Sequence, residues 1–134
     1  LLLGSDMGYI SDSGTWEPTF TGLVNSTPDV SVQTWNYSIS GDIVTFGGVV
    51  STVATAAGQC RTNITVVPNT VSNFSTAAQA SGTGSTINTL NNRFGVLFAD
   101  VPNEQLTFEW YATGAAEDKT FYVVGQYRLT RQLP

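Results

Sequence analysis

Residues 35–52, with the sequence WNYSISGDIVTFGGVVST, decide the fold. Apolar side chains take every second position on both sides of a short polar segment, at Trp35, Tyr37 and Ile39 before it and at Val44, Phe46 and Val50 after it. A period of two is typical of β-strands, so the stretch predicts a β-hairpin with a tight turn at residues 40–42. Gly41 can take the positive φ that a short hairpin turn requires.

Two consecutive glycines, Gly47 and Gly48, interrupt the second strand of this hairpin. Glycine inside a strand indicates a bulge or a place where another backbone comes close. Residues 14–20 show a similar alternation, with Pro18 inside it. Because proline cannot donate a hydrogen bond to a sheet, we expect this first strand to lie at a sheet edge or to contain a break.

The alternation recurs along the rest of the chain. We expect further strands at residues 63–68, 71–80, 93–99, 105–111 and 120–129, with a short one at 87–90. Residues 77–80 have a helix-like composition, but four residues are too few for a stable helix, and we favour a strand there. Residues 24–29 and 54–59 are expected to form loops, and residues 81–85 a flexible connection.

About eight strands at spacings of roughly 10 to 15 residues predict an all-β fold, an antiparallel β-sandwich of jelly-roll type. A chain of 134 residues fits one domain with a core that needs no disulfide or metal. We assign this domain to residues 14–134 and interpret residues 1–13 as a lead-in or linker. Val49-Val50 and Val123-Val124 place apolar side chains on both faces, which fits a sheet that buries outer surface against copies of itself.

The composition is neutral and rich in hydroxyl groups. Only 11% of the residues are charged, against about 25% in ordinary soluble domains, and the chain contains 19 Thr, 12 Ser and 9 Asn. The net charge is −5 and no basic cluster is present, so we expect no nucleic acid as a partner. No apolar run approaches the roughly 20 residues of a membrane-spanning helix, so we expect no membrane insertion.

Catalytic and metal-binding residues are scarce. Histidine is absent, which removes the commonest general base and the commonest zinc ligand. No calcium-loop or phosphate-loop motif is present, so we expect no metal, no cofactor and no enzymatic activity. Asp100 with Glu104, and Glu117 with Asp118, are the closest carboxylate pairs, and solvated side chains are the commoner interpretation in such loops. The single cysteine, Cys60, is interpreted as a small buried side chain.

Large aromatic residues are the remaining candidates for a binding site, because their faces can stack on sugar rings. The candidates for glycan contact are Trp16, Trp35, Trp110 and Tyr111. On strands, however, large aromatic side chains are more often part of the core. Both interpretations stay open at this point.

Several stretches of residues 14–129 match a known pattern in their order and spacing. They are Gly14, Thr15, Trp16, Pro18, Thr19, Tyr37, the run 41–48, Val67-Pro68, Ser72-Asn73-Phe74, Gly82-Thr83-Gly84 and the closing strand 121–129. In these stretches the chain resembles a family of bacteriophage virion proteins. That family comprises the β-sandwich domains near the C-terminal ends of tail-fibre, head-fibre and related appendage proteins.

The resemblance implies a non-enzymatic structural or receptor-binding module on the surface of a virion, usually a homotrimer that contacts other virion proteins. Capsid decoration and host attachment, with a cell-surface glycan as a candidate receptor, are the roles that it implies. Families of this kind carry no fixed catalytic residues, so no site residue is transferred. Because the chain begins with Leu1 and not with Met, we expect it to be a processed or trimmed piece.

Two other classes of function are alternatives. A monomeric carbohydrate-binding module would use exposed aromatic side chains, and it predicts sugar-dependent quenching of tryptophan fluorescence. A glycan-cleaving enzyme would use a carboxylate pair, and it predicts loss of activity when Glu104 or Glu109 is changed to Gln. The mass in solution distinguishes the virion module, at three times 14.3 kDa, from a monomer.

Overall fold

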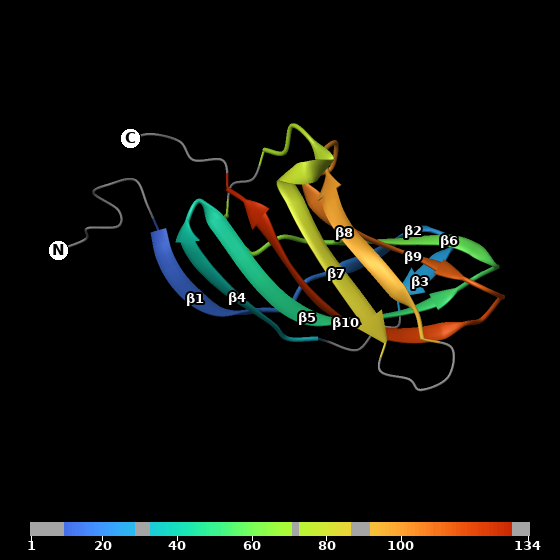
Figure 1. Ribbon diagram of the computed structural model, residues 1–134. Coiled ribbons are helices and arrows are strands. Elements are labelled where there is room, and N and C mark those ends of the chain that lie inside the picture. The colour runs from blue at the N-terminus through green and yellow to red at the C-terminus, as the bar shows by residue number, and fades with distance from the viewer. Residues whose placement is uncertain (1–9, 29–32, 71–72, 87–91, 130–134) are drawn as a thin grey trace.

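The computed structural model describes residues 10–28, 33–70, 73–86 and 92–129. Within these residues the chain forms ten strands and one short 3-10 turn (Figure 1). The elements are β1 (Ile10–Trp16), β2 (Phe20–Val24), β3 (Ser26–Pro28), β4 (Trp35–Gly41), β5 (Ile43–Ala54), β6 (Gly58–Ile64), η1 (Ala77–Gln79), β7 (Ala80–Thr86), β8 (Phe94–Asp100), β9 (Gln105–Ala112) and β10 (Asp118–Arg128). In this part of the chain, no helix is long and apolar enough to cross a membrane.

The ten strands form one antiparallel sheet. Nine of them follow the order β1-β4-β5-β10-β7-β8-β9-β6-β2, and β3 pairs with β5 outside this order. The long strand β5 pairs with β4 along its first half and with β3 along its second half. The sheet curls strongly, which creates an inner and an outer face (Figure 1). The all-β antiparallel class predicted from the sequence is confirmed. The layers of the expected sandwich are parts of one continuous sheet, a half-barrel, because β5 runs through the bend and joins them.

The hairpin predicted at residues 35–52 is formed by β4 and β5. Gly41 has a φ of 63°, as the tight turn requires. The register of β5 continues without a shift through Gly47 and Gly48, so no bulge is present there. Instead, the indole ring of Trp35 covers Gly48 so closely that a Cβ atom would overlap it. The close approach is therefore made by an aromatic side chain and not by backbone.

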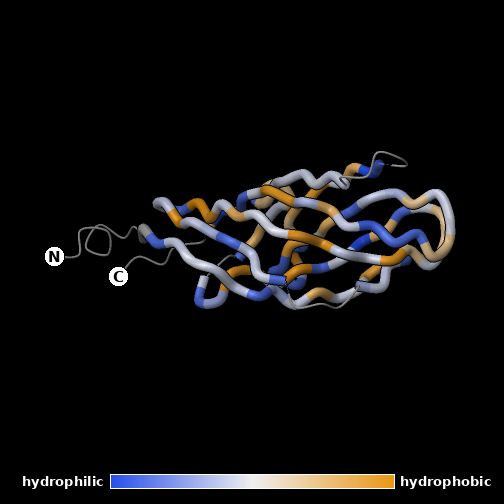
Figure 2. Tube along the Cα trace, turned by 90° about the horizontal axis from the view of Figure 1, so that it is seen from below, coloured by the Kyte–Doolittle hydropathy of each residue, from blue (hydrophilic) through white to orange (hydrophobic). Residues whose placement is uncertain are grey.

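The inner face of the sheet buries the core, and hydrophobic and hydrophilic segments intermix along the strands accordingly (Figure 2). Two aromatic clusters form its centre. The first has ring centroids 5.6 to 6.3 Å apart and contains Trp16, Trp35 and Phe46. The second has ring centroids 4.9 and 5.1 Å apart and contains Phe108, Trp110 and Phe121. The first cluster packs side chains of the neighbouring strands β1, β4 and β5 together, whereas the second connects β9 with β10, which are three places apart in the sheet.

The two features expected from Pro18, a strand at a sheet edge and a break in the strand, are both present. β1 ends before this proline, β2 begins after it, and the two strands lie at opposite edges of the sheet. The connection at residues 17–19 is held where the Thr19 N–H donates a hydrogen bond to Thr65 Oγ1 at 2.9 Å. The break at Pro18 thus lets the chain pass from one sheet edge to the other.

Two interpretations of supposed linkers are wrong. Residues 10–13, inside the segment 1–13 that we interpreted as a lead-in, pair with β4 and belong to β1. Residues 81–85, expected as a flexible connection, form most of β7, which pairs with β10 on one side and with β8 on the other. β7 contains no large apolar side chain, so its sequence lacks the alternation that identifies a half-buried strand.

Smaller differences concern the ends of elements. The strand favoured over residues 71–80 is wrong for the described part: η1 forms instead, and Gln79 Oε1 accepts a hydrogen bond from the Thr76 N–H at 3.2 Å. Of the strand expected at 63–68, residues 63 and 64 form the end of β6, which begins at Gly58, and residues 65–68 are not in a strand. The loop expected at 24–29 contains β3. The short strand expected at 87–90 lies outside the described residues.

Candidate functional site

Three of the four aromatic residues considered for glycan contact lie in the core. Trp16, Trp35 and Trp110 have exposed fractions of 6%, 0% and 1%. A buried indole ring has no face available to a sugar, so the structure does not support these three residues as glycan contacts. Tyr111 on β9 is 61% exposed and is the one candidate of the four at the surface.

Exposed apolar side chains gather on the outer face of the sheet. Those that are at least half exposed are Phe94 and Val96 on β8, Tyr111 on β9, and Tyr122 and Val124 on β10. The strand register arranges this face in rows. One row contains Val49, Tyr122, Ser85 and Phe94. The next row contains Gly47, Val124, Thr83, Val96 and Glu109.

A groove follows β7 between two ridges of larger side chains. We name them the β10 ridge, formed by Tyr122 and Val124, and the β8 ridge, formed by Phe94 and Val96. Between the ridges, β7 presents small hydroxyl side chains. The hollow that results, which we call the β7 groove, has a volume of about 300 Å³ and is lined by Thr83, Gly84, Ser85, Phe94, Tyr122 and Val124. Figure 1 shows β7 between β10 and β8.

The outer face around the β7 groove is free of charge. Its outward side chains at positions 45–51 of β5, 81–85 of β7, 94–98 of β8 and 122–126 of β10 are all uncharged. Charge begins directly beside these positions: Glu109 on β9 is opposite Val96 and pairs with Arg61 at 2.9 Å, and the Arg61 guanidinium lies 5.7 Å from the centre of the Phe98 ring. In a chain of net charge −5, this face is where two copies can approach with the least repulsion.

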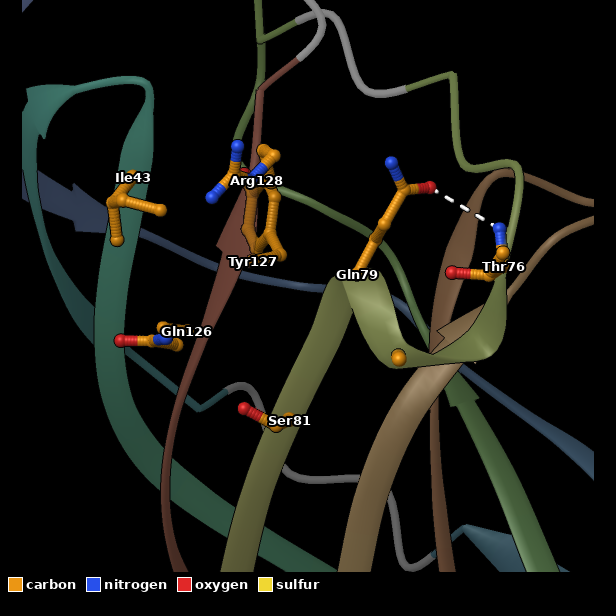
Figure 3. A pocket seen from close by; sticks show the side chains of 8 residues that line it. Ile43, Thr76, Gln79, Ser81, Gln126, Tyr127 and Arg128 are labelled. Carbon is orange, nitrogen blue, oxygen red and sulfur yellow. Dashed lines mark hydrogen bonds between the residues drawn. The ribbon is translucent and has the colours of Figure 1, made fainter.

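A second hollow lies at the other end of β7, beside η1 (Figure 3). It has a volume of about 180 Å³ and is lined by Ile43, Thr76, Ala78, Gln79, Ser81, Gln126, Tyr127 and Arg128. The charged residue in this lining is Arg128, and its Nη1 lies 3.4 Å from Asp42 Oδ2. The lining therefore offers amide and hydroxyl groups to a ligand, but no acid/base pair.

The carboxylates considered for catalysis have structural partners. Glu104 Oε2 accepts a hydrogen bond from the Phe74 N–H at 2.8 Å, and Glu109 pairs with Arg61. Asp100 Oδ2 accepts hydrogen bonds from two asparagine side chains at 2.7 and 2.8 Å. These contacts tie loops and strands together. In the described part of the chain, no group of three or more His, Cys, Asp or Glu side chains is placed to hold a metal ion.

Glu117 joins the loops at one end of the sheet. Its carboxylate accepts hydrogen bonds from the Thr113 N–H at 2.8 Å and the Thr113 hydroxyl at 3.0 Å, and Oε2 lies 2.6 Å from Arg93 Nε. Burial raises the pKa of this carboxyl, but the contacts with Thr113 and Arg93 outweigh burial, so the pKa of Glu117 lies below its ordinary value. The cluster fixes the β9–β10 loop against the start of β8.

Cys60 is buried, which confirms the interpretation of its side chain. The Asn25 amide nitrogen lies 3.5 Å from its sulfur. Burial, the largest effect, raises the pKa of the thiol, so the reactive thiolate is disfavoured.

Comparison with family models, with curated proteins and with solved structures finds no match to the chain. Its function is therefore argued from its own residues and geometry. The outer face around the β7 groove is the feature that carries this argument.

Sequence reasoning missed most of the β7 groove. Phe94, Val96 and Phe98 alternate along the strand expected at 93–99, but the buried positions of β8 are those of the other face, 95, 97 and 99. The signal that was available is the pair Val123-Val124. Val123 is buried and Val124 is 63% exposed, so apolar side chains do lie on both faces of β10.

Proposed function

We propose that the chain is a non-enzymatic structural or receptor-binding module of a bacteriophage virion, in a tail fibre, head fibre or capsid decoration, and that it acts as a homotrimer. The observation that carries the proposal is the apolar, charge-free outer face around the β7 groove. Exposed contiguous apolar surface of this kind marks a site of association. The resemblance of residues 14–129 to phage appendage domains supports the same function.

The size of this face suits stable association between copies. Three aromatic rings and two valines that are at least half exposed present apolar area on the order of 500 Å². This is near the upper end of the roughly 300 to 600 Å² found for the largest patch of a monomer. Together with the surrounding Ser and Thr, it approaches the ~800 Å² that each partner buries in a standard interface.

The arrangement of the chain also suits a module attached at one end. Ile10 pairs with Gly41, and the Leu129 N–H donates a hydrogen bond to the Asp42 carbonyl oxygen at 2.7 Å, so both ends of the domain lie beside the β4–β5 turn. The loops at 55–57 and 113–117 lie at the far end of β5. One end of the sheet can thus join a larger structure while the other points away from it.

Light scattering on the purified chain tests the proposal. We expect a mass of three times 14.3 kDa that persists on dilution to micromolar concentration. A monomer across the whole concentration range would contradict the homotrimer. The apolar outer face would then not be explained by association between copies.

A carbohydrate-binding module is the second candidate, because Tyr122 and Phe94 line the same groove as Ser85 and Thr83, whose side chains carry hydroxyl groups. The three tryptophans are buried, so direct stacking on them is not expected to quench their fluorescence. Titration calorimetry against a glycan panel tests this candidate. Binding by a monomer that Tyr122→Ala abolishes and Tyr111→Ala retains would favour it over the virion module.

A further inference from the structure

We infer that β7 lies at the three-fold axis of the homotrimer, and that the β10 ridge of each copy packs against the β8 ridge of the next copy. The occupant of the β7 groove is thus a second copy of this chain. The inference rests on the proposed function, and it names the surfaces through which the copies meet.

The two ridges provide what a cyclic trimer needs. In a ring of three, each subunit contacts its neighbours through two different patches, whereas a two-fold dimer uses one self-complementary patch. The β10 ridge and the β8 ridge are different surfaces that lie on opposite sides of one strand. Val124 and Val96 both neighbour Thr83 in the strand register, so the two ridges stand at the same level along β7.

The floor of the groove suits the crowded region near an axis. The outward residues of β7 are Ser81, Thr83 and Ser85, whose small side chains let three strands come close. A residue at a three-fold axis meets its own copies. Hydroxyl groups tolerate this, because each can donate and accept a hydrogen bond, whereas like charges would repel.

The ridges carry complementary apolar groups. Phe94 is 75% exposed and Tyr122 is 50% exposed, so each offers a ring that a partner can cover. Aromatic pairs prefer edge-to-face or offset contact, which rings on two inclined ridges can adopt. The Tyr122 hydroxyl can then stay at the rim in contact with water. Association would remove both ridges of every copy from solvent at once.

Cysteine cross-linking tests this arrangement. We expect a variant with both Val124→Cys and Val96→Cys to form a covalent trimer on mild oxidation, seen on a non-reducing gel, while either substitution alone forms no cross-link. Two strand spacings, about 9 to 10 Å, separate the two positions within one chain, which is too far for a disulfide between them. Cys60 is fully buried and does not take part.

A charge introduced into the β10 ridge provides a second test of the inference. We expect Val124→Asp to change the mass from three chains to one, with an unchanged circular dichroism spectrum. The matched control is Val24→Asp, because Val24 on β2 is also exposed, at 41%, but lies outside both ridges. The control variant should stay trimeric.

The outcomes separate this inference from the proposed function. Cross-linking by either single cysteine variant would show two-fold pairing and overturn the inference. A wild-type trimer without covalent trimers, in which Val124→Asp keeps the trimeric mass, would overturn the inference but leave the proposed function standing. A wild-type monomer would overturn both.

Discussion

At Gly48 the packing of the core leaves no room for a side chain. The Trp35 ring occupies the space where a side chain at this position would lie, and Trp35 Nε1 donates a hydrogen bond to the Val49 carbonyl oxygen at 3.2 Å. The ring is therefore held on both sides: by packing on the glycine and by a bond to the next residue. Any side chain at this position must displace the ring.

We expect Gly48→Ala to lower the free energy of unfolding by about 1 to 3 kcal/mol, because overpacking forces the indole out of its position. Urea unfolding followed by circular dichroism measures the change. Gly47→Ala is the control, since its Cβ would lie 3.6 Å from the nearest atom, an ordinary contact. Equal stability of the two variants would show that Trp35 moves without cost.

The hydroxyl of Tyr127 anchors a loop to the core. It accepts a hydrogen bond from the Val67 N–H at 3.0 Å and lies 3.0 Å from the Thr70 hydroxyl. We expect Tyr127→Phe to lower the free energy of unfolding by about 1 to 3 kcal/mol, because the buried Val67 N–H loses its partner. Tyr111→Phe, which changes an exposed ring, should leave chemical unfolding unaltered. An unchanged free energy of unfolding in Tyr127→Phe would contradict this role.

The lowered pKa of Glu117 predicts that the stability of the fold depends on pH. Its pKa is lowered in the folded state, so its contribution is present above the unfolded pKa of about 4.3 and is lost as pH falls through the folded pKa. We expect stability to fall more steeply below pH ~4.5 in the wild type than in Glu117→Gln. Unfolding free energies measured from pH 7 to 3 check this.

The control for this experiment is Glu17→Gln, which changes an exposed carboxylate. Its pH profile should parallel that of the wild type. If the Glu117→Gln profile also ran parallel to the wild type, the contacts with Thr113 and Arg93 would not stabilise the charged carboxylate.

At the scale of elements, β7 shows how a strand can form without an apolar face of its own. Glycines occupy its two central inner positions, 82 and 84, and a Cβ at Gly84 would lie 2.9 Å from the Phe108 ring. Aromatic side chains of neighbouring strands thus supply the packing that β7 lacks. Its hydrogen bonds to β8 and β10 complete the strand.

Hydrogen exchange followed by NMR distinguishes this central strand from a flexible connection. We expect the amides of residues 82–85 to exchange slowly, because neighbours on both sides accept their hydrogen bonds. Alternate amides of β1, which is at a sheet edge, should exchange faster. Fast exchange throughout residues 82–85 would contradict the central position of β7.

At the scale of the whole molecule, charge and apolar surface are separated. The net charge is −5, yet the outer face around the β7 groove carries none of it among the described residues. Association through this face should therefore depend on apolar burial and should be opposed only by general repulsion between copies. This gives the assembly a characteristic response to salt.

We expect the trimeric fraction to stay constant or to rise when salt is raised from roughly 50 to 500 mM, because screening weakens the repulsion between like-charged copies. Sedimentation velocity at several salt concentrations measures this fraction. Dissociation at high salt would indicate ion pairs at the interface and would contradict a charge-free contact.

Local pattern in the sequence by itself determined the all-β class, the β4–β5 hairpin with its turn at Gly41, and the effect of Pro18. The alternation also places Phe121 and Val123 on one face of β10 and Tyr122 and Val124 on the other. These features depend on neighbours a few residues away, so a short stretch contains the information.

Only the tertiary structure decided that β7 is a central strand, that Phe94 lies outside while Leu97 lies inside, and that Trp110 belongs to the core. Alternation shows that a strand has two faces, but burial of a face depends on strands that are distant in the sequence. β7 receives its packing from β8, β9 and β10, and the groove exists because ridges from two different strands flank it. Such long-range pairing leaves no periodic signal in any single segment.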